Sequence, residues 1–302
     1  SFDSTTSAQV TMPAEVTDEG TVLVSGRLLN EIARSLPNKP VDMTADHSQV
    51  ELTCGSARFS LQTLPVDEYP TLPEMPTQTG LVDASVFEKS VSQVVIAAGR
   101  DELLNVFTGV RVEINGDQLS LLATDRYRMA LKELTWQPSS PDIEGAVLVP
   151  GRVLADTAKS LTVSLSTTES EGEGLVGFIG EGTRGRREAT TRLLNQAFPK
   201  VRHLMDVVGT VTVRVPTADL LAAVKRVSLV AERNTPLRMI IEDDHIALEA
   251  ATGDQAHASE AIEAQVEVTG EEKSIEAAGF NPHYLLDALG ALDAPYAHFS
   301  FT

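Results

Sequence analysis

The sequence predicts an α+β fold made of three tandem homologous domains, in which helices are backed by antiparallel β-hairpins. The main observation is a duplicated segment: residues 23–36 read LVSGRLLNEIARSL, and residues 148–161 read LVPGRVLADTAKSL. Solenoid units repeat every roughly 20 to 50 residues, so this much longer spacing indicates a duplicated domain. Two further segment pairs repeat in the same order along the chain, residues 59–70 with 188–199 and residues 87–100 with 220–233.

Each copy of the duplicated segment predicts a short apolar strand that leads into an amphipathic helix. The first helix carries apolar residues at Leu29, Ile32 and Leu36, and two basic residues seven positions apart, Arg27 and Arg34. Seven residues at about 100° each return to nearly the same side of a helix, so both charges share one face. The second copy repeats this pattern, with apolar residues at Val153, Leu154, Ala158 and Leu161 and basic residues at Arg152 and Lys159.

The other repeated helix is also one-sided. Apolar residues recur at helical spacing, first at Phe87, Val91, Val94, Val95 and Ala98, and then at Leu220, Val224, Val227 and Ala231. In the later copy Arg226 and Arg233 are again seven residues apart, opposite the apolar stripe. Residues 280–292 (FNPHYLLDALGAL) fit a looser third copy of the strand-to-helix segment.

The order of these repeats predicts domain boundaries near Thr79 and Val208, which gives domains of residues 1–78, 79–207 and 208–302. These lengths suit ordinary domains. The first copy has no counterpart of the one-sided helix at residues 87–100 and 220–233. The third copy has no counterpart of the hairpin segment at residues 59–70 and 188–199. The chain also starts without Met and stops inside an apparent strand, so we expect a first domain clipped at its start and a third clipped at its end.

Composition limits the class of protein without naming a function. Hydrophobic residues make up 42% of the chain, enough for real cores. No segment approaches the roughly 18 apolar residues of a membrane span, and no signal sequence opens the chain. The lone Cys54 excludes an intramolecular disulfide and is typical of a reducing cytoplasm. Its place in an alternating strand predicts a buried structural thiol.

The net charge argues against DNA binding, whereas the placement of the basic residues argues for it. A formal net charge of −19 argues against a grip on nucleic acid, because such proteins usually show a basic footprint. Yet the ordered basic positions all lie on the repeated helices, while acidic residues cluster elsewhere. One surface could therefore touch DNA weakly while the rest repels it, as sliding requires. The alternative is that these charges are ordinary solvated helix faces.

Catalytic and metal-binding signatures are absent from the sequence. It contains no G-x-S-x-G, P-loop, C-x-x-C or H-E-x-x-H motif, and its six His residues are scattered singly. Asp243, Asp244 and His245 lie between two apolar strands, so we expect a polar hairpin turn there. Residues 169–174 (ESEGEG) predict a flexible acidic loop. The link from the predicted helix to the next strand, at residues 161–164, is unusually short.

Four segments together suggest a family: ARFSLQTLPVDEYP (57–70), LLATDRYRMA (121–130), LLNQAFPKVR (193–202) and GFNPHYLLDAL (279–289). With these motifs the chain resembles the bacterial DNA polymerase III beta subunits, the sliding clamps, over essentially its whole length. The segment GRLLNEIARSLPNKPV resembles an actinobacterial version. The resemblance implies three DNA-clamp domains, each with two helices backed by antiparallel sheet, and a head-to-tail homodimer that closes into a ring.

The same resemblance implies a function. The ring encircles duplex DNA without reading its sequence and, as a non-catalytic subunit without cofactor or metal, gives the polymerase holoenzyme its processivity. Partners would be the polymerase III alpha subunit, the clamp loader and repair proteins, which bind through short linear motifs. The residues expected to face DNA are Arg27, Arg34, Arg100, Arg152, Lys159, Arg226 and Arg233.

Family motifs also place a pocket for partner peptides. Its expected wall comprises Phe107, Thr124, Arg126, Tyr127, Arg128, Met129, Pro199, His203, Leu204, Asn234, Asn281 and Tyr284. Apolar side chains there would anchor a Leu/Phe-type peptide, and a few polar groups would fix its backbone. Several members, Met129, Leu204 and Tyr284, could instead be core residues.

The subunit interface is expected to join Ile32, Leu36 and Phe59 of one protomer to Leu229 of its partner. The family's last segment, which completes the pocket, and the first half of its first domain have no counterpart in this sequence. A polypeptide of this extent would have a weakened ring and a damaged pocket.

Two other classes of protein stay open at the level of sequence. An enzyme would need a converging acid/base or metal site. An acidic tandem-domain scaffold or adhesion protein would lack DNA binding and a basic concave surface. The repeated basic pairs on the helices favour the sliding clamp over both.

Overall fold

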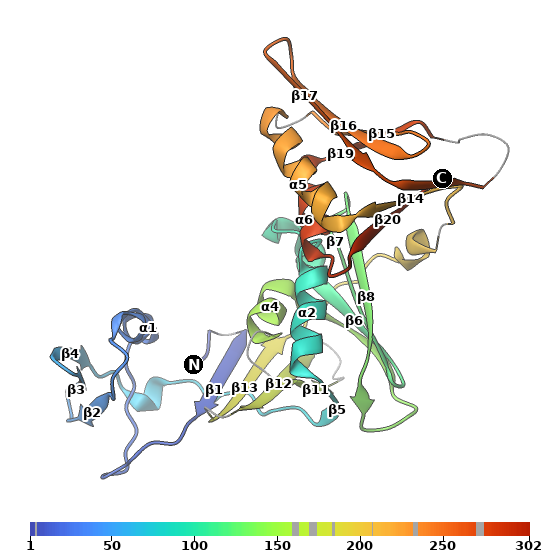
Figure 1. The fold of residues 1–302 in the computed structure, drawn as a ribbon. Helices are drawn as coiled ribbons and strands as arrows, with labels where there is room; N and C mark the ends of the chain where they lie inside the picture. Colours follow the sequence, from blue (N-terminus) through green and yellow to red (C-terminus); the bar gives the residue numbers. More distant parts are fainter. Residues whose placement is uncertain are drawn as a thin grey trace. The chain divides into compact units, whose positions relative to one another are not determined.

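The computed structural model describes residues 1–3, 5–158, 163–168, 174–182, 185–206, 208–231, 235–269 and 275–302. The chain divides into two compact units, one of Ser1–Thr79 with Leu161–Arg192 and one of Gly80–Ser160 with Leu193–Thr302. Figure 1 labels the elements of both units. The units follow contacts in space and not the order of the repeats, so the boundaries near Thr79 and Val208 stay predictions.

The first unit contains two antiparallel sheets. In one, the strand order is β1 (Thr6–Thr11), β13 (Gly185–Arg192), β12 (Leu175–Gly182) and β11 (Val163–Thr168), with Thr6 opposite Thr191 and Gly177 opposite Thr190. The other runs in chain order through β2 (Asp42–Ala45), β3 (Gln49–Cys54) and β4 (Ala57–Gln62). A short 3₁₀ helix, η1 (Val66–Glu68), follows β4.

Helix α1 (Gly26–Ser35) of this unit confirms the predicted amphipathic element. Ser25 caps its start by accepting a hydrogen bond from the backbone N–H of Leu28. The predicted apolar stripe of Leu29, Ile32 and Leu36 is half-buried, and α1 packs beside β4. Cys54 is buried, as expected, and its thiol points at the carbonyl oxygens of Pro37 and Lys39 at 3.5 and 3.6 Å.

The first half of the second unit holds a four-stranded antiparallel sheet, in the order β10 (Glu144–Pro150), β6 (Gly109–Asn115), β7 (Gln118–Thr124), β8 (Met129–Thr135). Strand β5 (Gln78–Val82) pairs with the short β9 (Gln137–Pro138). Helices α2 (Ala84–Val95) and α4 (Gly151–Ala158) pack together, with η2 (Glu102–Leu104) and α3 (Asn105–Thr108) between α2 and β6 in the chain.

The second half repeats this arrangement. One sheet has the order β18 (Gln265–Val268), β14 (Val211–Pro216), β20 (Tyr296–Phe301), and the other β17 (Ala256–Glu263), β16 (His245–Thr252), β15 (Leu237–Ile241), β19 (Ala277–Phe280). Helices α5 (Thr217–Val227) and α6 (Pro282–Ala291) lie side by side, as Figure 1 shows. The 3₁₀ helices η3 (Arg202–Met205) and η4 (Ser228–Val230) complete the unit.

The predicted apolar stripes differ from the structure near the ends of two helices, α2 and α5. In α2, Phe87, Val91 and Val94 are buried as predicted, and Val95 is half-buried. Ala97 is buried where Ala98 was expected. The helix ends at Val95, and the backbone N–H of Ala97 then bonds to the oxygen of Val94, which is the tighter 3₁₀ pattern. This tightening rotates Ala97 into the core, and leaves Ala98 half-buried.

In α5, Leu220, Val224 and Val227 are buried as predicted, and Ala231 is half-buried beyond the helix end. The predicted hairpin at residues 243–245 is confirmed, since the N–H of Glu242 donates to the oxygen of His245 between β15 and β16. No group of three or more metal-binding side chains occurs among the described residues. The acidic loop of residues 169–173 and the link at 161–162 lie outside the described residues, as does Leu161.

Candidate peptide pocket and DNA-facing helices

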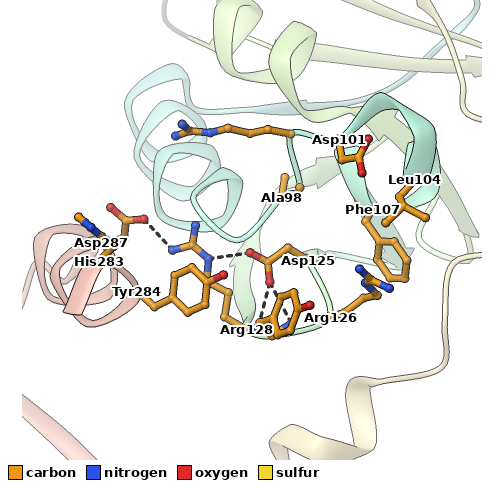
Figure 2. A pocket seen from close by; sticks show the side chains of 13 residues that line it. Ala98, Asp101, Leu104, Phe107, Asp125, Arg126, Arg128, His283, Tyr284 and Asp287 are labelled. Carbon is orange, nitrogen blue, oxygen red and sulfur yellow. Dashed lines mark hydrogen bonds and ion pairs between the residues drawn. The ribbon is translucent and has the colours of Figure 1, made fainter. Parts of the chain in front are cut away.

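A pocket of about 570 Å³ lies within the second unit, between the end of α2, the β7–β8 turn and α6. Figure 2 shows the side chains that line it. The lining residues are Ala98, Gly99, Arg100, Asp101, Leu104, Phe107, Asp125, Arg126, Tyr127, Arg128, His283, Tyr284 and Asp287. The wall thus combines aromatic faces with three arginines and three aspartates.

The β7–β8 turn is held rigid by its own side chains. The buried Thr124 hydroxyl donates to the carbonyl oxygen of Arg128 at 2.7 Å and accepts from the N–H of Arg126 at 3.2 Å. The Asp125 carboxylate accepts from the N–H groups of Tyr127 and Arg128, both at 3.0 Å. These bonds force Arg126 to a φ of 80°, the left-handed region that a residue with a side chain rarely adopts.

Arg128 joins the turn to α6. Its guanidinium pairs with Asp125 at 3.0 Å and with Asp287 at 2.6 Å, and it lies 4.4 Å from the centre of the Tyr284 ring. Burial works against the charged form, but the hydrogen bonds and charges of Asp287 and Asp125 outweigh it and raise the pKa of Arg128. Arg128 is therefore a fixed, neutralised part of the wall.

Arg126 has a different environment in the same pocket. Its guanidinium carbon lies 5.8 Å from the centre of the Phe107 ring and 5.7 Å from that of Tyr127, within the range of cation–π attraction. Figure 2 shows Arg126 next to Phe107, on the side of the turn away from Asp287. Tyr127 is 74% exposed, a large apolar surface for a side chain in a rigid turn.

A second hollow, of about 430 Å³, is formed by the segment that follows β13 and by strands β6 and β7. Pro199 and His203 line it, together with Phe198 and Arg202. The guanidinium of Arg202 bonds to Glu113 at 2.9 Å and also to Glu133, so the segment is tied to the sheet by charge. Arg202 therefore already has carboxylate partners at this hollow.

The predicted peptide-binding residues therefore separate into groups. Phe107, Arg126, Tyr127, Arg128 and Tyr284 line the first pocket, whereas Pro199 and His203 line the second hollow. Thr124 is buried beneath the turn, Met129 packs against the cluster of Leu122, Leu148 and Phe198, and Leu204 is exposed on η3. Asn281 accepts hydrogen bonds from His283 and Tyr284 as the N-cap of α6. Asn234 lies outside the described residues.

Sequence reasoning missed several lining residues. Asp287 and His283 lie four residues apart on α6, and Tyr284 and Asp287 lie three apart, so helical spacing from the predicted Tyr284 could have found them. Leu104 belongs to η2 and Asp101 caps its start, and no repeat gave a signal for this element. Arg100, expected to face DNA from the end of a helix, follows the end of α2 and lines this pocket.

The other residues expected to face DNA are exposed wherever the structure describes them. Arg27 and Arg34 lie on α1 opposite its half-buried face, and Arg152 lies in the first turn of α4. Arg226 of α5 uses two of its nitrogens to bond both carboxylate oxygens of Glu260 on β17. That bond raises the pKa of Arg226 and lowers the pKa of Glu260. Lys159 and Arg233 lie outside the described residues.

The four predicted interface residues differ in exposure. Leu229, in η4, is 84% exposed. Ile32, Leu36 and Phe59 are half-buried in the first unit. Among the described residues, no helix is both long and apolar enough to cross a membrane.

Solved structures show that the chain has a known three-domain fold. The chain matches a DNA polymerase III beta subunit of Thermotoga maritima with a TM-score of 0.83 and 22% identity, over 99% of this chain and 80% of that one. A sliding clamp of Pseudomonas aeruginosa, bound to griselimycin, matches with the same TM-score, identity and coverage.

Sequence comparisons give the family. Models of the DNA polymerase III beta subunit match in order: the N-terminal domain at residues 1–73, the central domain at 81–200 and the C-terminal domain at 202–302. The beta sliding clamp of Streptomyces coelicolor is 50% identical over 100% of this chain and 79% of its own length. That of Micrococcus luteus is 45% identical over 88% of this chain and 86% of its own. The chain belongs to the DNA polymerase III beta subunit family, in its actinobacterial branch.

Membership decides between the classes that the sequence left open. The protein is a DNA sliding clamp, a non-catalytic processivity factor of DNA replication, and the scaffold or adhesion alternative has no support.

Proposed function

We propose that this clamp acts in the cytoplasm as a head-to-tail homodimer, a closed ring that encircles duplex DNA and tethers the replicative polymerase. The observation that carries the proposal is the match of all three clamp domains, in order, along one chain. A ring holds DNA by enclosure, so the net charge of −19 does not conflict with the function. It helps the ring to slide, because strong phosphate contacts would hold it in place.

The basic residues on the repeated helices are the proposed contacts with DNA. Arg27, Arg34 and Arg152 are exposed and would touch phosphates transiently, and Lys159 and Arg233 belong to the same repeated positions. Arg226 contributes less in this proposal, since Glu260 already satisfies its guanidinium. Arg100 lines the peptide pocket, which makes it the weakest member of the set.

The test is retention on DNA of different topology. The clamp is loaded onto nicked circular DNA, the DNA is linearised, and the bound protein is measured before and after. A ring of two protomers stays on the circle and is lost from the linear form. Equal binding to both forms, or a monomer by solution mass, would refute enclosure.

A charge reversal tests the DNA-facing helices separately. Arg152→Glu, with Lys159→Glu, should lower retention on circular DNA while the fold stays intact by circular dichroism. The matched control is Arg187→Glu, because Arg187 is an exposed arginine on strand β13 and not on a repeated helix. Equal loss in both variants would show a general charge effect and not a DNA-facing surface.

We further propose that the pocket of Phe107, Arg126, Tyr127, Arg128 and Tyr284 binds short linear motifs of the polymerase III alpha subunit, the clamp loader and repair proteins. Aromatic walls with a few oriented polar groups suit an extended apolar peptide. Tyr127→Ala should weaken the binding of a Leu/Phe-anchored peptide about thirtyfold, which corresponds to the roughly 2 kcal/mol of an interface hot spot.

The control for this variant is Tyr296→Ala. Tyr296 is also a partly exposed tyrosine stacked on an arginine, Arg214 at 3.5 Å, but it lies outside the pocket. Peptide affinity that is unchanged in Tyr127→Ala would remove this residue from the binding surface.

A further inference from the structure

Two arginines of the first pocket, Arg126 and Arg128, differ in charge balance. Arg128 is neutralised by Asp125 and Asp287. Arg126 makes no ion pair with any carboxylate in the described part of the chain, and its guanidinium donates no hydrogen bond there. Arg126 thus places a positive charge at one side of the pocket without a carboxylate partner among the described residues.

The acidic residues of the pocket are already engaged elsewhere. Asp125 accepts bonds from the turn backbone and from Arg128, and Asp287 pairs with Arg128. Asp101 accepts a bond from the N–H of Leu103 and so caps η2. None of the three therefore neutralises Arg126, and a carboxylate for it has to come from outside the pocket.

The turn holds the Arg126 guanidinium in place. Thr124 and Asp125 fix the backbone, and the rings of Phe107 and Tyr127 lie within cation–π distance of the charge. Because the guanidinium donates no hydrogen bond to a described residue, its N–H groups are available to bind a carboxylate through two parallel bonds. A positive φ maintained at a non-glycine residue indicates that the position serves a purpose beyond folding.

We propose that Arg126 is a specificity-determining residue that binds a carboxylate of the partner peptide, next to the apolar anchors. This inference rests on the proposed peptide-binding function of the pocket. The occupant is an extended peptide with an apolar anchor beside an Asp or Glu side chain or beside its own C-terminal carboxylate. A partner with a neutral residue at that place binds without this contribution.

The test uses capped eight-residue peptides with Leu and Phe anchors in a Gly/Ser background, with Asp or Asn at each remaining position in turn. Fluorescence anisotropy gives the affinity of each for the full chain. At one position Asp should bind about tenfold more tightly than Asn, the scale of a charge-assisted hydrogen bond. A free-acid and an amidated version of the anchor peptide distinguish a side-chain carboxylate from a C-terminal one.

The discrimination should vanish in Arg126→Gln and Arg126→Gly and persist in Arg126→Lys at reduced size. Arg214→Gln is the matched control, because Arg214 also stacks on a tyrosine but lies outside the pocket, and it should keep full discrimination. Arg126→Gly removes the side chain while relieving the positive φ, so loss of folding cannot explain its result.

Each contrary outcome has its own meaning. Anchor peptides that bind without any Asp preference overturn the role of Arg126 and leave the peptide pocket standing. Absence of all peptide binding overturns both. Arg126-dependent binding of a single-stranded oligonucleotide, without Asp preference in the peptides, assigns the charge to phosphate and overturns the carboxylate assignment.

Discussion

At the scale of single residues, the β7–β8 turn shows how side chains set backbone geometry. Among the described residues Arg126 is the one non-glycine position with positive φ, at 80°. The left-handed conformation costs a residue with a Cβ roughly 1–2 kcal/mol relative to the right-handed one. Thr124 and Asp125 offset that cost with four hydrogen bonds to the three residues that follow them in the turn.

This strain predicts an unusual order of stability among substitutions at Arg126. Arg126→Gly and Arg126→Ala both remove the guanidinium and its ring contacts, but only Gly adopts the positive φ without steric cost. Arg126→Gly should be more stable than Arg126→Ala by about 1 kcal/mol, measured as the free energy of unfolding in urea. Equal stability of the two variants would show that the turn is not strained.

At the scale of elements, α2 shows a helix whose start and buried face have separate causes. Asp83 caps it by accepting from the N–H groups of Ser85 and Val86 at 2.9 and 3.0 Å, and also from the Ser85 hydroxyl. Phe87 is 0% exposed on its buried face, whereas the adjacent Val86 is 43% exposed. The cap determines where the helix begins, and the apolar stripe determines which side faces the sheet.

The cap predicts a pH dependence. The hydrogen bond from the Ser85 hydroxyl, followed by that from the Val86 N–H, lowers the pKa of Asp83 below its ordinary value of 3.8. Its stabilisation is therefore complete above that value and is lost as pH falls through the lower folded-state pKa. Asp83→Asn should be less stable than wild type at pH 7, with a gap that shrinks towards pH 3. A gap of constant size in urea unfolding would contradict this.

The buried face predicts a large contrast between neighbours. Phe87→Ala should cost about 3–5 kcal/mol, because it leaves a cavity in a fully buried site. Val86→Ala, one residue away on the exposed side, should change stability by less than about 0.5 kcal/mol. Chemical denaturation of both variants measures the difference, and similar costs would mean that α2 is rotated from the orientation described.

At the scale of the whole molecule, Leu229 carries the clearest sign of assembly. Leu229 is 84% exposed in one chain, and we propose that a partner protomer covers it. The proposed interface joins it to Ile32, Leu36 and Phe59 of the next protomer. This contact is heterologous, and two copies of it close the dimer into a ring.

This interface predicts that Leu229→Asp converts the dimer into monomer at concentrations where wild type is dimeric. Leu103→Asp is the matched control, because Leu103 is also almost fully exposed, at 92%, and is not part of the proposed interface. Analytical ultracentrifugation gives the mass of each. A dimer that persists in Leu229→Asp would exclude Leu229 as an interface anchor.

Sequence periodicity located helices and their buried sides, since each depends on local spacing of apolar residues. The stripes on α1, α2 and α5 followed directly, and the error at Ala97 arose only where 3₁₀ geometry replaced the α-helical pitch. Family motifs identified the turn of residues 124–129, but not which of its side chains reach the pocket. Met129 and Tyr127 are two residues apart, yet one packs in an apolar cluster and the other is exposed.

The sequence by itself determined the three-fold repetition, the family and therefore the sliding-clamp function, because these depend on which residues follow one another along the chain. Only the tertiary structure decided how the site is composed. It brought Asp287 and Tyr284 of α6 to Arg128 of the β7–β8 turn and placed Pro199 and His203 at another hollow. It also paired Arg226 with Glu260 and left Arg126 without a carboxylate partner in the part of the chain that the structure describes. Such pairings join residues far apart in the chain, and their distances follow from packing, which local sequence patterns do not encode.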